Sequence, residues 1–176
     1  MKKLILLFLL TIFFISACKE DTMESLKTVD YVDLECFMGD WYVIAIIPNF
    51  IEKDAVNGIE SYTLLDNNKV QIDYIFRKKH ADGKVKHLKP KAWIYNTKTN
   101  SEWRVQFIWP LKVPYLIVDL AEDYSYTVIG EPSRKFVWIM ARKPSIDDEI
   151  YNNIIQKLSQ VGYDVSKIQK MPQIWK

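Results

Sequence analysis

Two stretches of the chain place apolar side chains at every second position. They span residues 70–78 and 102–109. A period of two is typical of a strand with one face in a core and the other in water. The apolar faces consist of Val70, Ile72, Tyr74 and Phe76 in the first stretch and of Trp103, Val105, Phe107 and Trp109 in the second. We predict a half-buried strand at each stretch.

Short apolar runs separated by turn-forming residues continue this pattern through most of the chain. Turn signals at residues 66–69 and 81–84 join neighbouring runs at hairpin spacing. The runs predict eight antiparallel strands, at residues 41–47, 59–65, 70–78, 91–96, 102–109, 115–120, 124–130 and 136–142. Eight strands are enough to close an antiparallel sheet into an up-and-down barrel, so the expected class is all-β.

One stretch near the C-terminus has helical periodicity instead. Ser145 is the expected N-cap, Asp148 follows three residues later, and Gly162 is expected to end the helix. Its apolar stripe consists of Ile146, Ile150, Ile154, Leu158 and Val161. The last three predicted strands are apolar on both faces, and such strands need cover on both sides. We therefore expect this one helix to pack outside the barrel against them.

A glycine and a tryptophan mark the start of the first strand. Gly39 follows the turn-forming segment 33–38, where glycine indicates a sharp turn, and Trp41 begins the apolar run. Arg142, at the end of the last predicted strand, is the expected partner of Trp41. A guanidinium stacked on an indole is stabilising by roughly 0.5–2 kcal/mol. This contact would join the first strand to the last, as a closed barrel requires.

The N-terminus has the composition of a secretory signal, with a basic start, an apolar core and small residues at 16–17. Residues 15–18, Ile-Ser-Ala-Cys, resemble a bacterial lipobox, in which the peptidase cuts before a cysteine that carries acyl chains. We expect a lipoprotein signal peptide at 1–17, a tether at 18–28 lipidated on Cys18, and one domain at 29–176. The alternative is a plain signal peptide with an incidental cysteine.

Composition narrows the classes of function. The chain has 24 basic and 22 acidic residues, but the signal holds two lysines and no acid, so the remainder is balanced at 22 of each. A balanced charge does not suggest a nucleic-acid partner. If Cys18 carries lipid, Cys36 has no partner for an intramolecular disulfide. His80 and His87 flank a turn and form no zinc-ligand cluster with cysteine. We expect no metal and no cofactor.

Motifs near both ends of the domain at 29–176, called the body below, also carry a family resemblance. The matching segments are Gly39-Asp40-Trp41-Tyr42, Ile44-Ala45, Tyr62-Thr63-Leu64, Phe136-Val137-Trp138-Ile139-Met140-Ala141-Arg142-Lys143-Pro144, Asp148-Glu149 and residues 162–167. With these motifs in this order, the body resembles the lipocalins, and specifically the bacterial outer-membrane lipocalins related to apolipoprotein D. The turn after the sixth strand departs from the pattern, with Leu-Ala-Glu at 120–122 where the family often has Thr-Asp-x.

The resemblance implies a barrel that binds, stores or transports a small apolar ligand, and the bacterial branch resembles binders of fatty acids and lysophospholipids. An eight-stranded barrel has room for its own side chains or for one ligand. Alternation from Trp41 and Arg142 predicts an inward, cavity-lining set of Val43, Ala45, Tyr74, Phe76, Trp103, Phe107, Trp138 and Met140. The alternative is that these side chains fill the interior and leave no substantial cavity.

Two other classes of function are kept as alternatives. A few lipocalins isomerise lipids, but no nucleophilic triad or close carboxylate pair has recognisable spacing here, so we expect no catalytic residues. The second alternative is a protein-docking module on the envelope, with the barrel as a scaffold only. The sequence is compatible with a monomer or a homodimer.

The tether bears on location. The position directly after the lipidated cysteine resembles a sorting position at which aspartate retains a lipoprotein in the inner membrane. Here Lys19 occupies that position. We therefore expect a lipid anchor in the outer membrane. Lys19-Glu20-Asp21 also resembles the lysine-plus-acids signal for the cell surface, which leaves the leaflet open.

Overall fold

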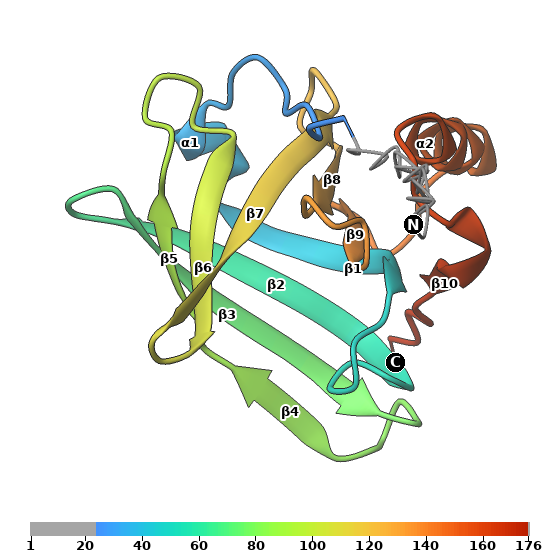
Figure 1. Ribbon diagram of the computed structural model, residues 1–176. Helices are drawn as coiled ribbons and strands as arrows, with labels where there is room; N and C mark the ends of the chain where they lie inside the picture. The colour runs from blue at the N-terminus through green and yellow to red at the C-terminus, as the bar shows by residue number, and fades with distance from the viewer. Residues whose placement is uncertain (1–23, 176) are drawn as a thin grey trace, which may run out of the picture.

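The chain folds into a closed antiparallel barrel with a helix packed outside it (Figure 1). The computed structural model describes residues 24–175. The barrel strands are β1 (Gly39–Ile47), β2 (Ala55–Leu65), β3 (Lys69–Lys78), β4 (Val85–Leu88), β5 (Lys91–Ile94), β6 (Glu102–Ile108), β7 (Leu111–Leu120), β8 (Tyr126–Gly130) and β9 (Val137–Ala141). β9 pairs back to β1 and closes the barrel. β4 and β5 both pair with β3 and together occupy one strand position of the barrel. The strands β1 to β9 therefore fill eight positions, and the predicted eight-stranded barrel is confirmed.

Three strand boundaries differ from the prediction. The fourth position is split by Pro90, which has no N–H to donate to a ladder, and its first half, β4, was not predicted. β7 begins at Leu111 rather than 115 and includes Pro114, which lies opposite Arg104. β2 begins at Ala55 rather than 59, and a shift in its register between 56 and 59 had obscured the alternation.

A bulge in β1 corrects one predicted cavity residue. The β1–β9 register runs Val43 to Met140 and then Ala45 to Ile139, so one extra residue lies between them. Beyond the bulge, Ile46 belongs to the interior cluster, whereas Ala45 packs in the second cluster beneath the external helix. The expectation that Ala45 faces the cavity is therefore wrong, because strict alternation from Trp41 does not allow for the extra residue.

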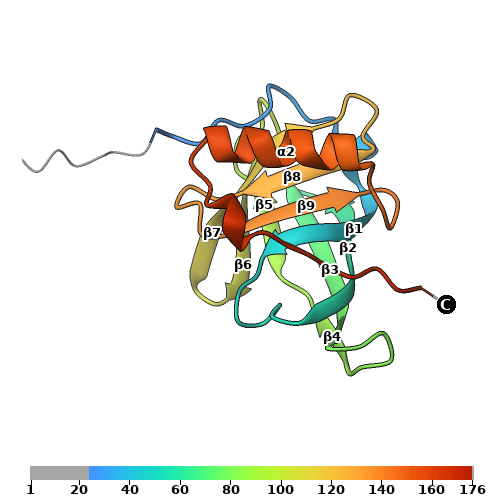
Figure 2. The same cartoon turned by 90° about the vertical axis from the view of Figure 1, so that its right-hand side faces the viewer.

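Helix α2 (Asp148–Gln160) lies outside the barrel across β8 and β9 (Figure 2), as predicted. Ile154 and Leu158 are buried against these strands, while Val161 is 43% exposed and does not complete the stripe. The N-cap is Asp147, which makes no side-chain capping hydrogen bond, so the prediction of Ser145 as the cap is wrong. Residue 145 lies in an irregular segment after Pro144, two residues before the cap.

After α2 the chain returns along the barrel wall. Gly162, with a φ of +90°, follows the C-cap of α2, as expected for a helix-ending glycine. The 3₁₀ turn η1 (Val165–Lys167) leads to β10 (Gln169–Lys170), which adds two paired residues to β1 opposite Ala45 and Ile46. This short strand was not predicted.

The up-and-down connectivity places successive loops at opposite ends. Segments 48–54, 79–84, 109–110 and 131–136 connect strands at one end, named the open end below. The other end, named the closed end, carries the short helix α1 (Leu34–Phe37), whose first N–H groups are capped by the Asp33 carboxylate.

The predicted contact between Trp41 and Arg142 is present at the closed end. The guanidinium carbon of Arg142 lies 3.7 Å from the centre of the Trp41 ring. Arg142 donates to the carbonyl oxygens of Asp40 (2.8 Å), Cys36 (2.7 Å), Phe37 (3.1 Å) and Met38 (2.9 Å). Gly39 has a φ of +89°, and a Cβ there would lie 3.6 Å from the Arg142 guanidinium. One side chain thus ties β9, α1 and the start of β1 together.

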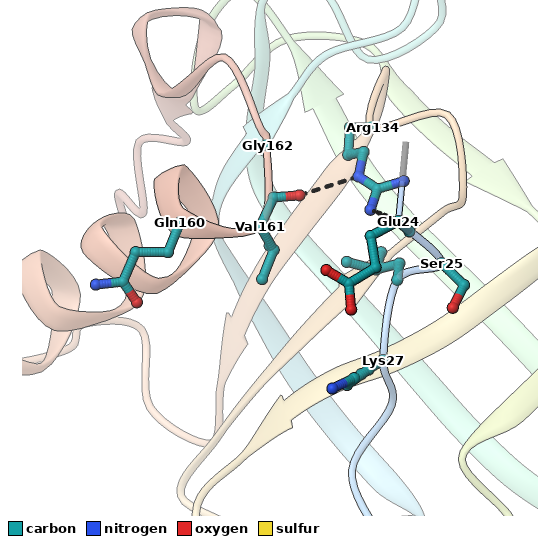
Figure 3. Close-up of a pocket in the computed structure, with 8 residues that line it drawn as sticks. Glu24, Ser25, Lys27, Arg134, Gln160, Val161 and Gly162 are labelled. Atoms are coloured by element: carbon teal, nitrogen blue, oxygen red, sulfur yellow. Dashed lines mark hydrogen bonds between the residues drawn. The ribbon is translucent and has the colours of Figure 1, made fainter. Parts of the chain in front are cut away.

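The described chain begins beside the open end. Arg134, in the loop between β8 and β9, donates to the carbonyl oxygen of Glu24 and, at 3.0 Å, to that of Val161 (Figure 3). Leu26 is buried in the cluster beneath α2, and the Val29 N–H donates to the Ile117 carbonyl at 2.9 Å. The signal peptide, Cys18 and Lys19 lie outside the described residues. No helix within residues 24–175 has the length and apolar character needed to cross a membrane.

Candidate functional site

A cavity of about 380 Å³ opens into the barrel from the open end. Its wall and rim are mainly apolar and aromatic, with residues from most of the strands and from the loops at 48–54 and 131–136. The residues that line it include Phe50, Ile51, Ile72, Leu88, Val105, Phe107, Ile108, Val113, Phe136 and Trp138. An enclosed apolar space of this size is typical of a site for a small ligand.

The eight predicted cavity residues divide into three groups. Tyr74, Phe107 and Trp138 line the cavity. Val43, Phe76, Trp103 and Met140 are fully buried in the interior cluster but do not line the open space. Ala45 lies on the other side of the wall, as described above. Ligand contact by Tyr74, Phe107 and Trp138 stays a prediction. The alternative, in which the interior side chains leave no substantial cavity, does not match the open space of about 380 Å³.

The half of the interior toward the closed end is filled by aromatic side chains. Phe37 of α1 has ring-centre distances of 5.2 Å to Trp41, 5.6 Å to Tyr62 and 5.5 Å to Trp103. Such distances are typical of favourable aromatic contacts. Packing of this kind closes the barrel beneath the cavity, so a ligand reaches the site from the open end only.

Sequence reasoning did not assign the two carboxylates at the base of the cavity. Glu60 of β2 lies between Trp41 and Tyr74 in the strand register, on the inward face, and is only 6% exposed. One carboxylate oxygen accepts hydrogen bonds from the hydroxyls of Tyr62 and, at 3.3 Å, Tyr115. The only signal in the sequence that Glu60 faces inward was its position two residues before Tyr62, on the same face of β2.

A second carboxylate comes from the loop after β1. Glu52 is 2% exposed and accepts a hydrogen bond from the Trp138 indole N–H at 2.8 Å. Asn49 holds the loop in place, since its amide donates to Glu52 and its side-chain oxygen accepts from the N–H of Ile51 at 2.8 Å. No sequence pattern indicated that a loop glutamate would turn into the barrel.

Burial makes ionisation of these acids unfavourable. It raises the pKa of Glu60 to about 7, and the nearby charge of Glu52 acts in the same direction, against the opposing hydrogen bonds from Tyr62 and Tyr115. Burial also raises the pKa of Glu52. The pKa of the Tyr74 phenol is raised well above its ordinary value by burial and then by the negative charges of Glu52 and Glu60.

The cavity lacks positive charge, and one of its hydroxyls lacks a well-aligned hydrogen bond. Among the described residues, no lysine, arginine or histidine lines it. The Tyr74 hydroxyl is buried beside the Glu52 carboxylate, but it makes no well-aligned hydrogen bond within residues 24–175. Nor do these residues contain a group of three or more histidine, cysteine, aspartate or glutamate side chains placed to hold a metal ion. The site combines an apolar wall with an acidic, phenolic base.

A family model described as the lipocalin-like domain matches residues 32–173. The chain therefore belongs to the lipocalin family, whose members are generally binding and transport proteins.

The chain is also similar to curated proteins over most of its length. It is 28% identical to temperature-induced lipocalin-1 of Arabidopsis thaliana, a match that covers 85% of this chain and 84% of that protein. It is 26% identical to the outer membrane lipoprotein Blc of Escherichia coli strain K12, with 88% of each chain covered.

Solved structures share the fold. Insecticyanin from the tobacco hornworm Manduca sexta matches with a TM-score of 0.65 at 20% identity, covering 86% of this chain and 85% of that one. At this level of identity the likeness shows the fold alone, a closed eight-stranded antiparallel barrel with the C-terminal helix outside.

Proposed function

We propose that this protein binds a small apolar ligand with a single hydrocarbon chain in its barrel and stores or carries it within the cell envelope. The observation that carries the proposal is the cavity of about 380 Å³, closed beneath by aromatic packing and lined mainly by apolar side chains. Each buried methylene contributes about 0.8 kcal/mol to binding, so a long chain can bind without many polar contacts. Fatty acids and lysophospholipids are the ligand classes expected from the resemblance.

The open end also supports exchange of such a ligand with a lipid surface. Phe50 is 87% exposed, Trp109 is 83% exposed, and Ile108 and Leu111 are each more than 60% exposed. All four belong to the loops at the open end or to the strand ends beside them. An exposed apolar rim that continues into an apolar cavity gives a lipid chain a path out of a bilayer without passage through water.

We further propose that the protein is anchored by lipid on Cys18 in the outer membrane. The name of the related lipoprotein Blc supports this location. Glu24 lies against the loop between β8 and β9, whose Glu131 and Phe136 line the cavity. The six residues from Cys18 to position 23 span at most about 20 Å when extended. An anchor on Cys18 would therefore hold the open end close to the bilayer.

Extraction followed by mass spectrometry tests the binding proposal. The mature chain carrying Cys18→Ala is purified without detergent, and its bound small molecules are released and identified. We expect single-chain lipids at up to one per protein. A preparation that contains none, and that also binds no long-chain alcohol on titration, would contradict the proposal.

Fractionation tests the location. Wild-type protein is expected in the outer-membrane fraction, and the Cys18→Ala variant is expected to be lost from membranes. Protease treatment of intact cells then distinguishes the leaflets, because only a surface-exposed protein is digested. Recovery of wild-type protein in the inner membrane would contradict the assignment.

A further inference from the structure

The acids at the base of the cavity are not explained by an apolar ligand alone. Glu52 and Glu60 are both buried, and burial of a carboxylate is unfavourable unless it is paired. Within residues 24–175 neither makes an ion pair, and their hydrogen-bond donors are the neutral side chains of Tyr62, Tyr115, Trp138 and Asn49. A barrel that binds only hydrocarbon would be more stable with neutral residues here.

The hydroxyl of Tyr74, which lies beside Glu52 without a well-aligned hydrogen bond, points to the same place. Tyr74 lines the cavity, and its neighbour in the register on β2 is Glu60. A buried hydroxyl without a well-aligned partner is unfavourable, and a polar ligand atom in the cavity would complete its hydrogen bonding. An acceptor lone pair on Tyr74 beside two carboxylates forms a set of oxygen atoms suited to a hydrogen-bond donor.

We infer that the cavity selects an amphiphile whose head group is an ammonium cation, held by the carboxylates of Glu60 and Glu52 and by the Tyr74 hydroxyl, over one with a free carboxylate. This inference rests on the proposed function and specifies the ligand class of the same site. An ammonium N–H to a carboxylate is a charge-assisted hydrogen bond, which is roughly twice as strong as a neutral one. The aromatic faces of Tyr115 and Trp138 in the same wall add attraction for a cation.

A carboxylate head group meets the opposite conditions. It would lie beside two acids, with no lysine, arginine or histidine among the described lining residues to pair with it. Like charges at close range disfavour ionisation of both groups, so such a ligand would bind only with protons taken up. The hydrocarbon chain of either ligand would extend along the same apolar wall toward the rim.

The titration of Glu60 gives the preference a pH dependence. The groups that face Glu60 are Tyr62 on β2, Tyr74 on β3, Tyr115 on β7 and Glu52 in the loop after β1, and all are neutral or negative. Burial raises the pKa of Glu60 to about 7. A cation favours the ionised form, so its affinity should rise as the pH increases through about 7, whereas the affinity of a carboxylate should fall.

Three probes with the same twelve-carbon chain test the inference: dodecylammonium, dodecanoate and dodecanol. Each is titrated below its micellar concentration into the mature Cys18→Ala chain. Binding is followed by the change in total tryptophan emission, to which Trp138 in the cavity wall contributes, and is checked by calorimetry. At about pH 8 we expect dodecylammonium to bind at least about tenfold more tightly than dodecanoate. Near pH 5.5 this ratio should fall several-fold, while dodecanol affinity should change little.

Matched variants identify the groups responsible. Glu60→Gln and Tyr74→Phe keep side-chain size, and both should reduce the preference for dodecylammonium over dodecanoate at about pH 8. Glu60→Gln should also remove most of the pH dependence. Glu122→Gln changes an exposed glutamate at the closed end and should leave all three affinities unchanged.

The outcomes separate this inference from the function on which it rests. If dodecanol binds but dodecanoate matches or exceeds dodecylammonium at about pH 8, the head-group inference is overturned and the apolar-ligand function stands. A preference for dodecylammonium that Glu60→Gln leaves intact would also overturn it. If none of the three probes binds, the proposed function fails as well.

Discussion

At the closed end, the guanidinium of Arg142 is surrounded by carbonyl oxygens and the face of Trp41, whereas at the base of the cavity Glu60 is surrounded by phenols and a second glutamate. The first charge has complementary partners on every side, and the second has hydrogen-bond donors but no opposite charge. The comparison suggests that Arg142 serves stability, and that Glu60 is kept at a cost to stability because it serves the ligand.

Replacing Arg142 should produce the largest effect on stability. Arg142→Ala removes the stacking on Trp41 and leaves carbonyl oxygens of α1 without their donor, so we expect a loss of about 3 kcal/mol in the free energy of unfolding. Arg142→Lys keeps the charge but not the planar fork and should lose less. Chemical denaturation measures both. Equal stability of Arg142→Ala and wild type would show that the closed end does not depend on this contact.

At the base of the cavity, replacing Glu60 should stabilise the protein. The pKa of Glu60 is raised from 4.5 to about 7 in the folded state, so the folded state binds protons more tightly than the unfolded chain. Stability should therefore fall as the pH rises from about 4.5 to about 7, and the cost is fully present above pH 7. Glu60→Gln should raise the free energy of unfolding by up to about 3 kcal/mol at pH 8, since one pKa unit corresponds to about 1.4 kcal/mol.

Denaturation curves at several pH values check this prediction. The gain from Glu60→Gln should vanish near pH 4, where the carboxyl is protonated in both states. A variant that is less stable than wild type at pH 8 would mean that the hydrogen bonds from Tyr62 and Tyr115 outweigh the cost of burying the charge.

The closed end is also the end that the sequence predicts better. Its determinants are local in the sequence or lie at the ends of strands that alternate clearly, so the pairing of Trp41 with Arg142 beside Gly39 follows from the sequence alone. The strand alternation likewise predicts a closed barrel with inward Tyr74 and Trp103.

The site inside the cavity depends on features that alternation does not encode. A single extra residue in β1 turned Ala45 outward, and Pro90 split one strand position in two. Glu52 reaches the cavity from a loop, and its position is set by Asn49 and Trp138, which are far apart from one another in the sequence. Glu60 lies on an inward face by parity, but its meeting with Tyr115 requires the closed barrel.

Two tyrosines offer a matched test of the comparison within the interior. The hydroxyl of Tyr62 hydrogen-bonds to Glu60 and to the hydroxyl of Tyr115 (2.5 Å), whereas the hydroxyl of Tyr74 makes no well-aligned hydrogen bond among the described residues. Tyr62→Phe should lower the free energy of unfolding by about 1–2 kcal/mol, and Tyr74→Phe should leave it unchanged or raise it by up to about 1 kcal/mol. Thermal and chemical denaturation of the two variants side by side measure the difference. Similar losses for both would show that Tyr74 has a partner in solution.

The smallest effect on stability is expected at the rim, where the comparison extends to ligand exchange. Trp109 is 83% exposed, so Trp109→Ser should change the free energy of unfolding by less than about 0.5 kcal/mol. It should, however, slow the uptake of ligand from vesicles, because tryptophan is favourable at the interface between lipid and water. Stopped-flow transfer of a fluorescent single-chain lipid measures the rate. Tyr31→Ser, at a position 60% exposed near the closed end, is the control and should leave the rate unchanged. Equal slowing by both variants would mean that the open end has no special part in exchange with the bilayer.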